Sequence, residues 1–501
     1  MVSTLGYQLV SIISGMLIPR FLIGSFGSSV YGAASSIGQF LSYVTLLEGG
    51  IGGVARAELY QPLALNNKKD ISKIYNTIVR YFRIIGVLFL TYTVILACVY
   101  PKIADVSFFS TDYTFFLVIA ISLSTVAQYF FGIANLTLLN ADQKRYISNM
   151  VMIVTTVVNA VMVIMLVNCG CDILTVKLCS SSIFVLRPII FSLYVQKHYQ
   201  LDASQKGDKT VLKQKWTGLG QHLAYYLHTN TDVVILTILS DLKNIAVYSI
   251  YNLVVSSIRN IVTALTGGME AIFGEMIAKK EEKELSRAYW YYELIISFVS
   301  LVLFGAAAIL IIPFVKLYTK DFSDALYVQP LFALIILITE AINCIFLPCC
   351  ALPIAANQFK ETRWGAYGEA LINVVVSCIL VVWNPLLGVA IGTAVSVVYK
   401  NIYYYWYVSK NILHTSIRQG KNYLLYMFAL LTITIVGNIL IDMICIDSMI
   451  KWAVCGVVVV LGTGMAVSVF YTLLYGSQFF DVAKRLLGKF VVFGNANSGG
   501  K

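Results

Sequence analysis

Residues 15–43 read GMLIPRFLIGSFGSSVYGAASSIGQFLSY, and residues 232–260 read DVVILTILSDLKNIAVYSIYNLVVSSIRN. When the two stretches are aligned from their first residues, Val30–Tyr31 of the first corresponds to Val247–Tyr248 of the second. Each stretch has a short turn just before the Val-Tyr pair and a long apolar segment after it. Repeats of this kind are typical of transporters built from duplicated helix bundles. We therefore predict an internal duplication.

The chain around this repeat is apolar over most of its length. Hydrophobic residues make up 58% of it and charged residues 12%, whereas a soluble globular protein carries about 25% charged residues. A bilayer core requires about 20 apolar residues in a helix, and lipid offers no partner to an open strand edge. We therefore predict an all-α polytopic membrane protein with fourteen spans, at 2–24, 31–57, 78–100, 113–138, 146–168, 173–195, 218–240, 246–277, 288–315, 326–350, 362–383, 386–408, 422–441 and 450–475.

The basic residues between these segments fall mainly in every second gap. One set of gaps holds 26 of the 36 Lys and Arg residues, with Lys400 counted among them, and the other set holds six. Because cytoplasmic loops carry the excess of Lys and Arg, we predict that both termini are cytoplasmic. The net charge of +11 then suits an anionic inner leaflet of membrane lipids and requires no nucleic acid.

The longest polar gap separates six segments from eight, and an even number of spans gives the two repeats the same orientation. We predict five regions along the chain: an N-lobe of six spans at 1–198, a cytoplasmic linker at 199–217, a C-lobe of six spans at 218–409, two further spans in 410–476, and a cytoplasmic tail at 477–501.

Arginines inside the segments are the first candidate site residues, because a charge in a membrane is costly and usually faces a cavity. Arg20 follows Pro19 in the first segment, and Arg259 lies near the middle of the eighth. A guanidinium binds phosphate groups bidentately, so we predict that both bind an anionic group. The alternatives are snorkelling or lobe packing for Arg20 and an ion pair for Arg259. Arg56, near Glu58, forms either a gate pair or an interfacial pair.

Acidic residues also lie within the segments. Glu48, Glu270 and Asp232 are predicted to line the cavity or its gates, and Glu340 and Glu369 are weaker candidates. His228 and Asp232 are spaced i,i+4, so their side chains can meet on one helix face. They form either a site for H+ or Na+ or a buried polar pair.

The glycine pairs Gly49–Gly50 and Gly267–Gly268 occupy similar places in the two repeats and are predicted hinges. No nucleotide-binding or hydrolase motif is present, and the ten cysteines have no spacing typical of a metal site. We therefore expect no cofactor and no metal. Arg187, beside Pro188, is interpreted as structural.

Several short motifs now indicate a family. Pro19-Arg20-Phe21-Leu22, Val30-Tyr31-Gly32, Thr231-Asp232-Val233-Val234-Ile235 and Asn244-Ile245-Ala246-Val247-Tyr248 resemble the Wzx-type polysaccharide flippases of the multidrug/oligosaccharidyl-lipid/polysaccharide (MOP) exporter superfamily. Glu48-Gly49-Gly50 resembles the corresponding part of the lipid II flippases.

The resemblance implies two six-helix bundles arranged in a V, followed here by two C-terminal helices. It implies a bacterial cytoplasmic membrane protein that moves undecaprenyl-diphosphate-linked O-antigen or capsule repeat units by alternating access. Helices 1, 2, 7 and 8 then line a cationic cavity with Arg20, Arg56 and Arg259. We expect a functional monomer that associates with polysaccharide polymerase or export proteins.

Three alternatives remain at this point. A cation-coupled multidrug antiporter of the MATE type would rely on Asp232 and Glu48 in an acidic cavity, and a lipid II flippase would share the fold. A membrane polysaccharide polymerase is a remote alternative, because the outward gaps are only about 5–15 residues long and leave little room for a catalytic domain.

Overall fold

The computed structural model describes residues 2–48, 51–202, 204–205, 219–414, 421–476 and 478–479. Within these ranges all regular secondary structure is helical, and each of the fourteen predicted spans overlaps a helix or a broken helix. Ten of the described helices are long and apolar enough to cross a membrane, or eleven if one bent pair counts as a span. The prediction of an all-α polytopic protein is confirmed, and the count of fourteen crossings stays a prediction.

The chain divides into two compact units. The first unit comprises 1–253, 319–327 and 366–393, and the second comprises 254–318, 328–365 and 394–501. The predicted lobes at 1–198 and 218–409 do not coincide with these units, because α9 packs beside α1 in the first unit. The division into lobes therefore stays a prediction.

The first unit begins with ten helical elements, whose order follows the predicted spans: α1 (Val2–Ser42), α2 (Thr45–Glu48), α3 (Ile51–Ala64), α4 (Lys68–Ile103), α5 (Thr111–Ala127), the π-helix η1 (Gln128–Gly132), α6 (Ile133–Ala141), α7 (Arg145–Asn168), α8 (Ile173–His198) and α9 (Leu219–Leu239). It also holds the start of α10 (Leu242–Leu265) and parts of α15 (Phe359–Leu380) and α16 (Pro385–Asn411).

Gly27 divides α1 into two arms. Its backbone has φ 82° and ψ 168°, a conformation that glycine adopts more readily than residues with a Cβ. The chain therefore turns at Gly27, and the arms 2–26 and 28–42 contain the first predicted span and the start of the second.

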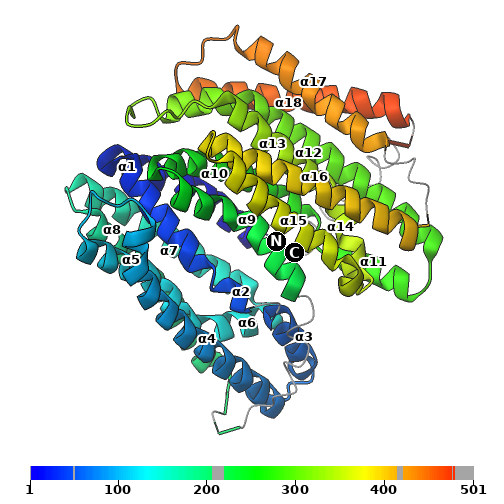
Figure 1. Ribbon diagram of the computed structural model, residues 1–501. Helices are drawn as coiled ribbons and strands as arrows, with labels where there is room; N and C mark the ends of the chain where they lie inside the picture. The colour runs from blue at the N-terminus through cyan, green and yellow to red at the C-terminus, as the bar shows by residue number, and fades with distance from the viewer. Residues whose placement is uncertain are drawn as a thin grey trace, which may run out of the picture. The chain divides into compact units, whose positions relative to one another are not determined.

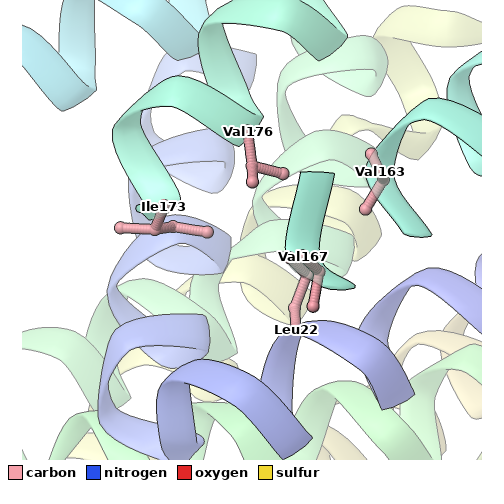
Figure 2. Packing of buried hydrophobic residues seen from close by; sticks show 5 residues of the cluster. All are labelled: Leu22, Val163, Val167, Ile173 and Val176. Carbon is pink, nitrogen blue, oxygen red and sulfur yellow. The ribbon is translucent and has the colours of Figure 1, made fainter. Parts of the chain in front are cut away.

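One apolar cluster of the first unit joins α1 to α7 and α8. Figure 2 shows Leu22 of α1 against Val167 of α7, with Val163 from the same helix and Ile173 and Val176 from α8. All five side chains are buried. Lipid tails are as apolar as these side chains, so close packing rather than escape from water stabilises this contact.

The second unit is built around α12 (Glu282–Tyr318) and contains five further helices: α11 (Met269–Ala278), α13 (Pro330–Ile345), α14 (Leu347–Ala355), α17 (Lys421–Ile441) and α18 (Met449–Tyr475). Helices α17 and α18 both pack along α12 (Figure 1). The contact is close at Gly437, where a Cβ would lie 2.1 Å from the Ile309 side chain. Tyr471 of α18 adds a polar contact, since its hydroxyl donates to Ser297 Oγ at 2.7 Å.

Helix boundaries recur along the chain with nearly the same separation as the two Val-Tyr pairs. At that separation α12 corresponds to α4, α15 corresponds to α7, and α16 corresponds to α8. Each half also has one span interrupted at a corresponding place. The first is interrupted by η1, and the second by the 41° bend between α13 and α14. This recurrence agrees with an internal duplication.

Candidate functional site

A charged cluster lies among the membrane helices of the second unit. Arg259 Nη1 of α10 is 3.6 Å from Glu340 Oε1 of α13. The Asn343 amide donates to the same Glu340 oxygen at 3.1 Å, and Lys400 Nζ of α16 donates to Asn343 Oδ1 at 3.0 Å. We call these four residues the basic cluster. The ion pair that was the alternative interpretation of Arg259 is present.

The basic cluster contains two cationic side chains, those of Arg259 and Lys400, and the carboxylate of Glu340. The Arg259 side chain is 22% exposed, and that of Glu340 is 9% exposed. Water therefore screens these charges poorly, and an uncompensated charge is costly among apolar helices. An anion bound here could form charge-assisted hydrogen bonds with the two cationic side chains.

Lys400 corrects the sequence analysis, which counted it among the loop residues. It lies inside α16, well away from both ends of that helix, and it is half-buried. The neighbouring aromatic run, Tyr403–Tyr407, is typical of a membrane interface. Lys400 was therefore counted with the residues on the cytoplasmic side of that interface. A lysine inside the apolar segment 386–408 was the signal that could have identified it.

A second polar cluster lies in the first unit around Asp232 of α9, which is buried. Tyr248 donates to Asp232 Oδ2 at 3.0 Å, and Thr393 donates to Asp232 Oδ1 at 3.0 Å. The Asn373 amide in turn donates to Thr393 Oγ1 at 2.8 Å. Asn373 and Thr393 were missed by the sequence analysis, although polar residues in apolar segments are a usable signal.

Ser377 extends this cluster. It lies one turn after Asn373 on α15, and its Oγ is 2.0 Å from the place of a Cβ on Gly392, the neighbour of Thr393. Among the described residues, Asn373 Oδ1 and Ser377 Oγ are buried without a hydrogen-bond partner. We call Asp232, Asn373, Ser377 and Thr393 the oxygen cluster. One carboxylate with neutral oxygens suits a small monovalent cation or a proton, since hard cations prefer oxygen ligands.

Other acidic candidates occupy different places. Glu48 accepts a hydrogen bond from the Tyr129 hydroxyl of η1. Glu270 is exposed in the first turn of α11. Glu369 is buried in α15. The side chain of His228 lies outside the described residues, so its predicted pairing with Asp232 stays a prediction. Within the described part of the chain, no group of three His, Cys, Asp or Glu residues is placed to hold a metal ion.

Arg20 lies in the first unit, near the Gly27 turn, and pairs with Asp321 at 3.3 Å. Asp321 belongs to the 319–327 segment between α12 and α13, and both partners are partly exposed. Arg56 is exposed, and its Nε donates to the Gly52 carbonyl at 3.0 Å. Arg187 donates to Thr155 at 2.7 Å and to Thr156 at 2.8 Å, contacts that join α8 to α7.

The 319–327 segment binds the Gly27 turn at several further points. Asp324 accepts hydrogen bonds from the Ser28 N–H at 2.6 Å and from Ser28 Oγ at 2.7 Å, so it caps the start of the second arm of α1. The hydroxyls of Ser28 and Tyr327 are hydrogen-bonded. Tyr251 of α10 donates to the Tyr327 carbonyl at 2.8 Å. We call this segment the latch.

Beyond the turn, the second arm of α1 forms a polar seam with α9. The hydroxyls of Ser36 and Thr237 lie 2.7 Å apart, the Gln39 amide donates to Asn230, and Ser42 contacts the Tyr226 hydroxyl. Helix α10 starts close to the same arm, because a Cβ on Gly32 would lie 2.0 Å from the Leu242 carbonyl oxygen. The latch, the seam and this approach join the second arm of α1 to α9, α10 and residues 319–327 within the first unit.

One predicted hinge coincides with a break in a helix. Helix α10 ends at Leu265, and α11 begins after Gly268, which has φ 88° in the left-handed region. Glycine adopts this conformation without the steric cost that a Cβ brings. Gly49 and Gly50 lie outside the described residues, so the first predicted hinge stays a prediction.

No protein-family model and no curated protein matches this sequence, but several solved structures match its fold. The lipid II flippase MurJ, in an inward closed conformation, is 14% identical with a TM-score of 0.70, over 94% of this chain and 99% of that chain. The MATE multidrug transporter DinF-BH, in complex with R6G, is 14% identical with a TM-score of 0.59, over 83% and 95%.

A further match is the inward-facing conformation of a multidrug resistance MATE family transporter of the MOP superfamily, 14% identical with a TM-score of 0.56, over 80% of this chain and 95% of that chain. At this identity the matches define a fold and nothing finer. The part of the chain that the structure describes is all-helical, and the chain is a multi-pass membrane protein. It has the fold of the MOP superfamily, as the resemblance implied.

Proposed function

We propose that this chain is a flippase that moves undecaprenyl-diphosphate-linked oligosaccharide repeat units across the bacterial cytoplasmic membrane for surface polysaccharide synthesis. The basic cluster carries the proposal, because it places a guanidinium and an ammonium group near each other among apolar helices. Both cations suit a diphosphate, and a guanidinium binds one through two parallel hydrogen bonds. A MOP fold supplies a transport framework without a nucleotide site.

In this mechanism the Arg259 guanidinium and the Lys400 ammonium hold the diphosphate, while the prenyl tail stays in lipid. The role predicted for Arg56 in binding the substrate stays a prediction. Arg20 was predicted for the same role, and its ion pair with Asp321 gives it a second candidate role in holding the latch. Both termini are proposed to be cytoplasmic, so the Gly27 turn and the latch lie on the outer side.

The latch and the seam then keep the outer side closed while the substrate enters from the cytoplasm. Breaking the contacts of the latch and the seam would open the outer side, with rotation at the Gly268 break and at the predicted Gly49–Gly50 hinge.

Export in cells tests the proposal as a whole. In a strain lacking this gene, the wild-type chain should restore surface polysaccharide, and a chain lacking both Arg259 and Lys400 side chains should not.

The first prediction concerns the latch. Asp324→Ala removes both hydrogen bonds to Ser28, so the outer side should open more often. In a cysteine-depleted background, a cysteine at the buried Ser36 should react several-fold faster with an impermeant maleimide added from outside. Asp105→Ala, on another exposed loop, should leave the rate unchanged. Equal rates for all three proteins would show that the latch does not hold this side closed.

The second prediction concerns ion coupling, which we assign to the oxygen cluster. Asp232→Asn keeps the shape of the side chain but removes its negative charge, so a bound Na+ or H+ loses its only carboxylate in that cluster. Transport by this variant should fall at least about tenfold and lose its dependence on the ion gradient. Asp241→Asn, in the exposed turn after α9, is the matched control. Full gradient dependence in Asp232→Asn would remove Asp232 from coupling.

Two other functions share this fold. The oxygen cluster also suits a cation-coupled multidrug antiporter, which would export organic cations and confer drug resistance. A lipid II flippase would restore growth to cells depleted of that activity. Resistance or growth that depends on this chain, without any effect on surface polysaccharide, would favour one of these functions over the proposed one.

A further inference from the structure

We propose that the Glu340 carboxylate is a built-in counter-anion: it occupies the place beside Arg259 that the diphosphate takes, and it limits how tightly the substrate is held. This inference rests on the proposed function and deepens it. It gives Glu340 a positioning role that a plain structural ion pair would not have.

The distance between Arg259 and Glu340 indicates that a substrate phosphate can replace the Glu340 carboxylate at the guanidinium. A charge-assisted N–H···O hydrogen bond is about 2.7–2.9 Å long, whereas Arg259 Nη1 and Glu340 Oε1 are 3.6 Å apart. The attraction therefore operates without a tight direct hydrogen bond. A diphosphate oxygen could form the shorter, bidentate contact to the same guanidinium.

Asn343 holds the carboxylate and Lys400 together. Its amide nitrogen donates to Glu340 Oε1, and its amide oxygen accepts from Lys400 Nζ. The Asn343 side chain therefore bridges the anionic Glu340 and the cationic Lys400, with its NH2 group on the carboxylate and its oxygen on the ammonium group. This arrangement places Glu340 where it offsets both cations, and Asn343 links it to Lys400.

Charge balance explains what such a carboxylate does during transport. Without substrate, Glu340 offsets part of the positive charge of Arg259 and Lys400, which lowers the cost of these charges among apolar helices. A diphosphate brings two negative charges, so the carboxylate and the diphosphate repel each other and compete for Arg259. Competition weakens binding and favours release, and the carboxylate stabilises the empty protein during its return.

Binding of a prenyl diphosphate tests this inference. The purified full-length protein in lipid nanodiscs is titrated with farnesyl diphosphate, and farnesyl monophosphate serves as the weaker-charged comparison. Glu340→Gln removes the competing charge and keeps the shape, so it should bind farnesyl diphosphate about tenfold more tightly than the wild type. Glu293→Gln changes another buried carboxylate of the second unit and should bind like the wild type.

The variants separate this inference from the proposed function. Weaker binding by Arg259→Ala, together with unchanged or weaker binding by Glu340→Gln, would overturn the inference and leave the site in place. Unchanged binding by both Arg259→Ala and Lys400→Ala would remove the proposed diphosphate site itself. If Glu340→Gln does not fold, Glu340→Asp is used, because its shorter carboxylate should also compete less and bind the probe more tightly.

Discussion

Arg259→Ala should reduce transport of the lipid-linked glycan by about a hundredfold or more. The change removes a guanidinium that can form two charge-assisted hydrogen bonds with a diphosphate, each stronger than a neutral hydrogen bond. A loss of about 2.7 kcal/mol of such binding in the transport barrier corresponds to a hundredfold. Arg259→Lys keeps the charge but loses the planar fork, so its transport rate should fall between those of the wild type and the alanine variant.

Loss of transport must be separated from loss of folding, because Arg259→Ala leaves Glu340 buried without its ion-pair partner. Removing one partner of a buried pair destabilises a protein strongly. The double variant Arg259→Ala/Glu340→Gln should therefore recover much of the lost thermal stability and still fail to transport. Recovery of transport in the double variant would show that Arg259 serves only to neutralise Glu340.

Gly32→Ala should also abolish transport, by a different route. A Cβ on Gly32 would lie 2.0 Å from the Leu242 carbonyl oxygen and 2.8 Å from its carbon. Both atoms belong to the backbone, so no side chain can turn aside and α10 must move away from the second arm of α1. The closed arrangement of the latch and the seam should then be lost, with faster external labelling of a cysteine at Ser36.

Gly38→Ala is the matched control on the same arm, since a Cβ there meets no atom within 4 Å. This variant should transport normally and should be slightly more stable, because alanine is the better helix former by roughly 0.5–1 kcal/mol. Transport by Gly32→Ala equal to that of Gly38→Ala would show that the close approach at Leu242 is not needed in the cycle.

Helix positions followed from the sequence because each depends on local composition. A run of apolar residues long enough to cross a bilayer must satisfy its own backbone, so the predicted spans coincide with helices. Irregular points were harder to predict. A hinge was predicted at Gly267–Gly268 inside a continuous span, and the structure has a break between α10 and α11 there. The left-handed turn at Gly27 was expected only as a short connection.

The site was predictable only in part, because a sequence shows which charges are buried but not which groups meet them. Arg259 and Asp232 were selected as costly charges, and Glu340 as a weaker candidate. The contacts of Arg20 and Ser28 with the latch join residues that lie far apart in the sequence. No local sequence pattern predicts such contacts. Lys400 was missed because a lysine near an aromatic run also fits the edge of a membrane.

A translocation measurement with purified protein tests the central claim most directly. Liposomes containing only this protein, with a Na+ or H+ gradient imposed, are loaded with a fluorescent prenyl-diphosphate-linked oligosaccharide, and its appearance in the opposite leaflet is followed with an impermeant quencher. We expect the wild-type protein to exchange the lipid between leaflets, and the Arg259→Ala/Lys400→Ala variant to match protein-free liposomes. Equal exchange by wild type and variant, or no exchange by the wild type, would contradict the account.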